Sequence, residues 1–230
     1  MQTSAHPLQL AFEVFQNRDA YFEKVGADGY PNHIIRGQVS LIFASGAAYG
    51  LIMGSYNGAW QSLSSAMKLP ALVFLTLAIC FPSFYIVQLL LGSKMTLRQL
   101  VVMLLSGFVM FTTILVAFAP ISLFFQMSGS PYTFLQLLHF GIFAFAGFWS
   151  MRTVAEALKM ACETNNIYPK TGLAVFRVWI FILAFVGIQL SWNLRPFIGN
   201  KEMVFEWFRN DTQGNIYATL LAAFGNLMGL

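Results

Sequence analysis

Apolar residues dominate long stretches of this chain, and polar residues gather in short connections between them. A helix needs about 20 apolar residues to cross a bilayer core of about 30 Å. Five stretches come close to or exceed that length, and a turn-forming segment at 126–132 separates the third from the fourth. The pattern therefore predicts five transmembrane helices, at about 37–54, 69–92, 100–125, 132–151 and 173–194.

The two ends of the chain differ from these spans. In the first 36 residues, Leu8, Phe12, Phe15 and Phe22 share one helical face, which predicts an amphipathic helix lying in the membrane interface, on a partner or on the chain's own spans. The stretch 215–230 is apolar but short, and is predicted to form a re-entrant or interfacial helix or a sixth span. The expected fold is an all-α polytopic transmembrane bundle, organised as a cytoplasmic segment 1–36, a bundle 37–194 and an outer-side segment 195–230.

Two prolines fall inside the predicted spans. Pro82 and Pro120 each lack a backbone N–H, so each is expected to kink or end its helix.

Charge narrows the class of protein. Only 10% of the 230 residues are charged, against about 25% in soluble domains, and no Asp or Glu occurs between Asp28 and Glu156. No predicted span carries a central charge, which argues against a proton or cation pump. The net charge of +4 suits anionic lipid headgroups, and the scattered basic residues do not indicate nucleic-acid binding. Cys80 and Cys162 are predicted to be free thiols, the second in a polar connection.

The distribution of Lys and Arg predicts the orientation. With five spans, the side that holds the N-terminus carries nine of these residues and the opposite side carries four, as counted along the sequence. Because cytoplasmic loops are enriched in Lys and Arg, the N-terminus is expected in the cytoplasm, with the chain in a bacterial inner membrane.

Glycines recur every fourth residue in and after the first span. Small residues at this spacing form a groove that allows another helix to approach closely. The groove is expected to pack against this chain's own helices or against another subunit. The residues are Gly46, Gly50, Gly54 and Gly58.

The connection that follows, 55–70, is polar and carries Tyr56, Trp60 and Lys68. Aromatic residues at this position are typical of an interfacial belt. The alternative is a contact surface for a partner, to which Trp192 would also belong.

Polar side chains in the last two spans are expected near one side of the membrane. They would either form hydrogen bonds between helices or line a pocket for a lipid headgroup, a quinone-like ring or a small solute. No cofactor is signalled, and His139 has no second ligand nearby in sequence that would suggest a metal or haem. The pocket residues are Gln136, His139, Gln189, Asn193 and Arg195. On the cytoplasmic side, Glu156 and Lys159 are expected to face each other on a solvated helix.

Several short motifs carry a family resemblance. Lys68-Leu-Pro70, Cys80-Phe-Pro-Ser-Phe-Tyr85, Leu91-Gly-Ser93 and Trp192-Asn-Leu-Arg-Pro-Phe-Ile-Gly199 resemble those of a family of bacterial polytopic membrane proteins, over about 36–217. The five spans after a polar N-terminus are also similar in architecture to the Yip-like membrane proteins. Neither resemblance implies a function or a functional residue.

Two functions are compatible with this sequence. The first is a non-catalytic accessory, scaffold or assembly subunit of a larger membrane complex, which would contact lipids and either other membrane proteins or further copies of itself. The second is a small oligomeric channel or transporter for a neutral solute, an anion or a lipid. An enzyme is not expected, because no nucleophile motif, nucleotide loop or metal-ligand spacing is present.

Overall fold

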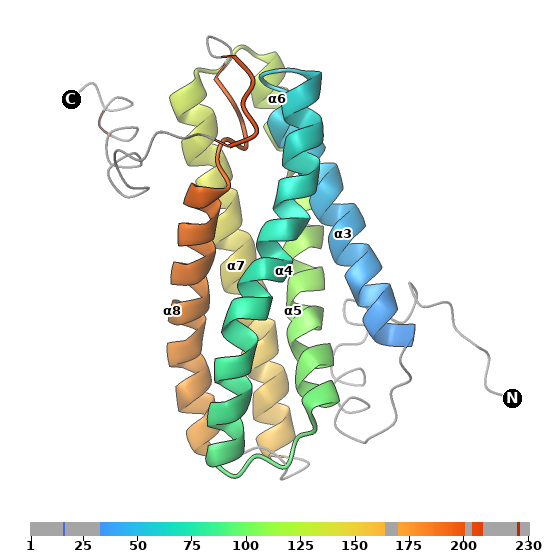
Figure 1. Ribbon diagram of the computed structural model, residues 1–230, viewed down its shortest axis with the longest axis vertical. Helices are drawn as coiled ribbons and strands as arrows, with labels where there is room; N and C mark the ends of the chain where they lie inside the picture. The colour runs from blue at the N-terminus through green and yellow to red at the C-terminus, as the bar shows by residue number, and fades with distance from the viewer. Residues whose placement is uncertain (1–15, 17–32, 164–169, 201–203, 209–224, 226–230) are drawn as a thin grey trace, which may run out of the picture. The chain divides into compact units, whose positions relative to one another are not determined.

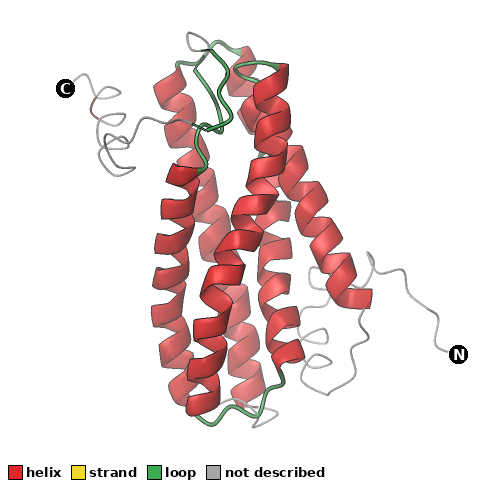
Figure 2. Cartoon of the chain, viewed as in Figure 1, coloured by secondary structure: helices red, strands yellow, loops and turns green. Residues whose placement is uncertain are grey.

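A computed structural model describes residues 16, 33–163, 170–200, 204–208 and 225. Every regular element in these residues is helical (Figures 1 and 2), which confirms the predicted all-α class. The predicted N-terminal amphipathic helix and the C-terminal apolar helix lie outside the described residues. The helices are α3 (His33–Gly54), α4 (Ala59–Leu90), α5 (Leu97–Ala117), α6 (Ala119–Met127), α7 (Tyr132–Glu163) and α8 (Lys170–Asn193).

Five spans are confirmed within the described chain. With α5 and α6 taken together as Leu97–Met127, five helical segments are long and apolar enough to cross a membrane. The chain therefore fits an integral membrane protein. The predicted break between the third and fourth spans is also present, and its Gly129 has a φ of 75°, which a residue with a side chain rarely adopts.

The second span begins earlier than predicted. Helix α4 starts at Ala59 and continues through Pro70 and Pro82, so most of the polar connection predicted at 55–70 is helical. Ser83, next to Pro82, donates a hydrogen bond to the carbonyl of Cys80 (2.8 Å). Pro120, by contrast, acts as predicted: α5 ends at Ala117, and Pro120 lies in the first turn of α6.

Helix α7 extends past the predicted end of its span. Its last part carries two exposed ion pairs, Arg152–Glu156 (3.0 Å) and Lys159–Glu163 (3.8 Å), each four residues apart. Glu156 is partly exposed and Lys159 is exposed on this helix, which confirms the solvated helix face that their spacing predicted. Cys162 lies in this helix and is buried; it and Cys80 are free thiols, as predicted.

The chain divides into two compact units, each assembled from parts of several helices. Unit 1 comprises Met1–Phe43, Leu77–Phe111 and Gly147–Leu183. In its described residues, Phe84 of α4 packs against Phe176 and Trp179 of α8, with ring centroids 5.6 and 4.6 Å apart. The Trp179 indole also donates to the carbonyl of Cys80 (3.1 Å). Aromatic packing with a satisfied indole N–H thus fixes α8 against α4.

A buried amide joins two further helices of unit 1. Gln38 of α3 is 1% exposed, and its Nε2 donates to Ser106 Oγ (2.7 Å) and to the carbonyl of Val102 (3.0 Å) in α5. Nearby in the same unit, Gly107 of α5 faces Val154 of α7, and a side chain at Gly107 would overlap the Val154 methyl group.

Unit 2 comprises Ala44–Thr76, Thr112–Ala146 and Ala184–Leu230. Here the glycine groove of α3 receives the first half of α4. A Cβ at Gly50 would lie 2.9 Å from Ala66 Cα, and one at Gly54 would lie 2.7 Å from Ser62 Cα. The contact at Gly46 is less close, because a Cβ there would lie 3.2 Å from a Leu69 methyl group. These three glycines therefore let α3 and α4 of the same chain approach backbone to backbone.

Gly58 does not belong to this groove. It lies in the turn before α4, with a φ of 151°, and a Cβ there would meet nothing within 4 Å. Regular spacing in sequence predicted a fourth member of the groove, but α3 ends at Gly54 and the helical face ends with it.

Substitution of Gly50 or Gly54 by Ala should destabilise the protein. The added methyl group would collide with main-chain atoms of α4, and overpacking of this kind costs about 1–3 kcal/mol. Thermal unfolding in detergent measures the loss. Gly147→Ala in α7 is the matched control, because a Cβ there meets nothing within 4 Å; it should be neutral or slightly stabilising. Equal effects at the three positions would contradict the close approach of α3 and α4.

Candidate functional site

Four polar side chains of unit 2, in and just before α4, donate hydrogen bonds to the chain that follows α8. Gln61, Ser65 and Lys68 are spaced by four and three residues, so they share a helix face, and Asn57 precedes them. We call these residues the donor row. Each acceptor that they reach after α8 is a main-chain carbonyl of the described residues 196–200 and 204–207, which we call the carbonyl segment.

The bonds of the donor row are distributed along the carbonyl segment. Gln61 Nε2 donates to the carbonyls of Pro196 (2.8 Å) and Phe197 (3.0 Å), and Ser65 Oγ also donates to Phe197. Asn57 Nδ2 donates to the carbonyl of Asn200. Carbonyls outside a helix receive no hydrogen bond from secondary structure, so the side chains of the donor row supply the donors.

Lys68 is the most unexpected member of the row. It is 4% exposed, and its Nζ donates to the carbonyls of Pro196 (3.1 Å) and Trp207. The same ammonium lies 4.9 Å from the centroid of the Phe208 ring, within cation–π range. Two carbonyls and an aromatic face thus compensate for the desolvation of this charge. Lys68 is a buried residue of helix α4 and does not lie in a connection, so that part of the prediction is wrong.

Helix α4 is long enough to contain the charged Lys68 and still provide an apolar span. The helix has 32 residues and is about 48 Å long, which exceeds a hydrocarbon core of about 30 Å. The part after Lys68, 69–90, carries no charge and is by itself long enough to cross that core.

Gly199 permits the carbonyl segment to lie close to α4. Its φ is 71°, and a Cβ there would lie 2.9 Å from Asn57 Cβ and 3.0 Å from Gln61 Cγ. Both the backbone conformation and the lack of space therefore require glycine.

A second buried polar cluster joins three helices of unit 2. Tyr49 Oη of α3 lies 2.7 Å from His139 Nδ1 of α7, and 3.5 Å from Ser122 Oγ of α6. Tyr49 is fully buried and His139 is 4% exposed. His139 Nε2 is buried and has no hydrogen-bond partner. The bond to Tyr49 is therefore the polar contact that holds the His139 ring.

Hydrogen bonds also connect α6 to the end of α3. Gln126 Nε2 donates to the carbonyl of Ile52 (3.0 Å), and its Oε1 accepts from Ser55 Oγ (3.0 Å). Tyr56 stacks on Tyr132, with ring centroids 6.3 Å apart. These bonds close the turn between α6 and α7 onto the end of α3 within unit 2.

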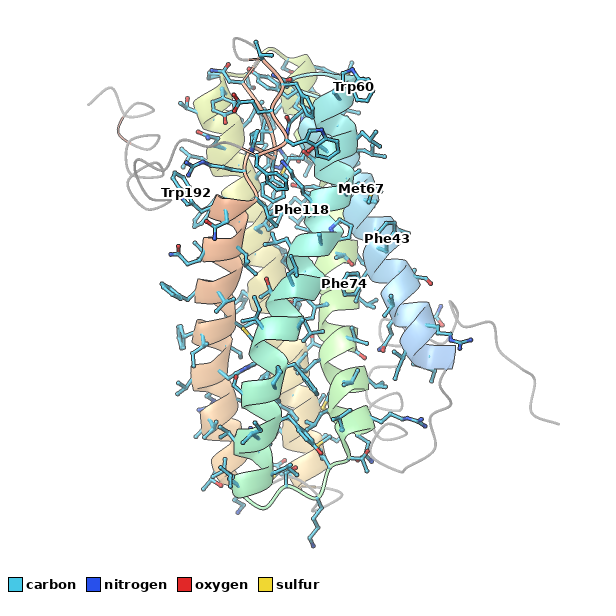
Figure 3. The ribbon with its side chains drawn as sticks, viewed as in Figure 1. Phe43, Trp60, Met67, Phe74, Phe118 and Trp192 are labelled. Atoms are coloured by element: carbon cyan, nitrogen blue, oxygen red, sulfur yellow. The ribbon has the colours of Figure 1, made fainter. Side chains whose placement is uncertain are left out.

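The residues of the predicted polar pocket have different surroundings. His139 is buried against Tyr49, Gln136 and Gln189 are half-buried, and Asn193 is exposed. The Arg195 guanidinium lies 3.6 Å from the centroid of the Trp192 ring, so these two residues form a cation–π pair. Trp60 is 68% exposed and points outward from the first turn of α4 (Figure 3), as an interfacial residue would.

Sequence reasoning missed Tyr49, Gln61, Ser65, Ser122 and Gln126. A signal was present for two of them, because Gln61, Ser65 and Lys68 recur at helical spacing within a segment interpreted as a connection. Tyr49 and Ser122 lie singly in apolar runs and gave no signal.

The contacts described at this site are hydrogen bonds and the cation–π contact of Lys68 with Phe208. The donor row offers donors to main-chain carbonyls, and the Tyr49–His139 pair has no described carboxylate among its hydrogen-bond partners. Among the described residues, no group of three or more His, Cys, Asp or Glu side chains could hold a metal ion.

No protein-family model, curated protein or solved structure matches this chain. The resemblance carried by the Lys68–Pro70 and Trp192–Gly199 motifs therefore stays a prediction.

Replacement of Lys68 by Met should release the carbonyl segment. The Trp207 carbonyl would lose the Lys68 donor, and a hydrogen bond to a charged group contributes about 1.5–3 kcal/mol. We expect lower thermal stability and faster amide hydrogen exchange in residues 204–208, measured by mass spectrometry. Lys94→Met, which removes an exposed cation, should change neither quantity. Unchanged exchange in Lys68→Met would show that this contact does not hold the segment.

The Tyr49–His139 bond should appear as a coupling energy. Tyr49→Phe leaves both His139 ring nitrogens without partners, and His139→Leu leaves the Tyr49 hydroxyl with only the long contact to Ser122. In a double-mutant cycle followed by thermal or denaturant unfolding, the two single costs should exceed the cost of the double variant by about 0.5–3 kcal/mol. Additive costs would argue against the bond.

Proposed function

We propose that this chain is a non-catalytic integral membrane protein that acts as an accessory or assembly subunit of a larger complex in a bacterial inner membrane. The observation that carries the proposal is the low burial of α8. Only 17% of its most apolar 18-residue window is buried within the chain, against 61% for the window in Leu97–Met127.

The exposed face of α8 is large and aromatic. Phe181 is 77% exposed, and Val178, Ile182 and Phe185 are 50–61% exposed. An isolated small bundle would place such a face against lipid, whereas a subunit would place it against another transmembrane helix. Aromatic side chains favour the second use, because they bury a large area per residue with few rotatable bonds.

The buried polar groups support a structural role. Gln38, Tyr49, Gln61 and Lys68 each bond to a neighbouring helix or to the carbonyl segment. Polar atoms used in this way hold helices together and are not available to a solute.

Photo-crosslinking in intact cells tests the proposal. A photoreactive amino acid at Phe181 or Phe185 should yield discrete adducts with another membrane protein, identified by mass spectrometry. The same amino acid at Ile79 of α4, which is 55% exposed, serves as the matched control and should yield mainly lipid adducts.

Two outcomes would count against an accessory subunit. One is lipid adducts alone at Phe181 and Phe185, with a monomeric native mass after extraction in mild detergent. The other is solute flux through liposomes that contain only this chain, which would favour the alternative of a small channel or transporter.

A further inference from the structure

Only some of the exposed Lys and Arg side chains of unit 1 form ion pairs with described residues. Its described residues include seven Lys and Arg side chains and two acids, Glu156 and Glu163. Both acids pair with cations of their own helix, at Arg152 and Lys159. Among the described residues, no ion pair is formed by the other five cations, which are Arg36, Lys94, Arg98, Lys170 and Arg177.

Four of these cations come from neighbouring helix ends. Lys94 and Arg98 belong to the turn between α4 and α5 and to the start of α5, and Lys170 and Arg177 belong to the first two turns of α8. The contacts of Phe84 with Phe176 and of Cys80 with Trp179 set α4 and α8 antiparallel, so the end of α4 meets the start of α8. In Figure 1 the end of α4 and the start of α8 lie at the bottom of the view, and the turn 91–96 connects that end of α4 to the start of α5. We call Lys94, Arg98, Lys170 and Arg177 the basic patch.

The helix termini add positive potential at the same place. Arg98 is the second residue of α5 and Lys170 is the first of α8, and neither helix has an acidic residue in its first turn. The N-terminus of a helix carries a partial positive charge, so a cation there is unfavourable. An anion bound between these side chains would reduce the repulsion among the cations and the repulsion between the cations and the helix N-termini.

Apolar side chains beside the patch indicate where the anion comes from. Leu90, at the end of α4, is 81% exposed, and Leu97, next to Arg98, is 50% exposed. A free phosphate would gain nothing from them, whereas a phospholipid would place its phosphate on the cations and its acyl chains on the leucines.

We propose that the basic patch is a binding site for the phosphate headgroup of an anionic phospholipid. The paired cations Arg152 and Lys159 take no part, because their charge is already compensated within α7. Arg177 lies four residues before Phe181 of the proposed partner face of α8, whereas Lys94, Arg98 and Lys170 lie outside that face. The variant Lys94→Gln/Arg98→Gln therefore tests the site independently of that face.

Lipid association measured by electron spin resonance tests the site. The full chain is reconstituted in phosphatidylcholine vesicles that contain spin-labelled phosphatidylglycerol or spin-labelled phosphatidylcholine, and the ratio of the two association constants gives the preference. Two double variants are compared with the wild type, Lys94→Gln/Arg98→Gln and Lys170→Gln/Arg177→Gln. Because a basic residue near an anionic surface is worth about 1 kcal/mol, each pair should lower the preference by about fivefold or more.

The matched control is Arg152→Gln/Lys159→Gln, which changes the net charge by the same two units and should keep the wild-type preference. High salt should weaken the preference of the wild type. The proposal is overturned if the control loses as much as the test pairs, if both test pairs bind as the wild type does, or if millimolar inorganic phosphate displaces the lipid. Two test pairs are used so that one remains informative if the other fails to fold.

Discussion

The hydrogen bonds between the donor row and the carbonyl segment are the contact on which unit 2 depends most. After α8 ends at Asn193 the chain has no helical partner for its carbonyls, yet Pro196 is buried and Phe197 is half-buried. In an apolar protein, each such carbonyl would cost several kcal/mol if left without a donor. Gln61, Ser65 and Lys68 remove that cost, and the irregular backbone can lie against α4 as a result.

Helix α3 packs closely against the part of α4 that also contacts the carbonyl segment. Gly50 and Gly54 bring the backbone of α3 against that of α4 around Gln61–Ala66, which is also the part that carries most of the donor row. Helices that pack through small residues gain van der Waals contact without bulky side chains. The face of α3 that meets α4 is thus free of side-chain volume, and polar side chains of α4 bond to the segment that follows α8.

Burial is distributed unevenly among the helices, and this is the basis of the proposed function. The window in Leu97–Met127 is largely enclosed by the rest of the chain, whereas α8 buries Phe176, Trp179 and Leu183 and leaves Phe181 and Phe185 outside. Apolar surface that a chain does not cover itself is available to lipid or to a partner. At the charged helix ends of unit 1, ion pairs neutralise Arg152 and Lys159 of α7. The cations of the basic patch form no ion pair with another described residue.

The sequence by itself determined the membrane class, the five spans, the break before α7 and the close-packing glycines Gly46, Gly50 and Gly54. These features depend on local properties, namely the length of apolar runs relative to the bilayer, turn-forming residues and residue spacing. Only the tertiary structure placed Lys68 inside α4 and joined it to a carbonyl 128 residues away, or paired Tyr49 with His139 across 90 residues. The acceptors of the donor row are main-chain carbonyls, which every residue possesses, so no pattern of side chains could have identified them.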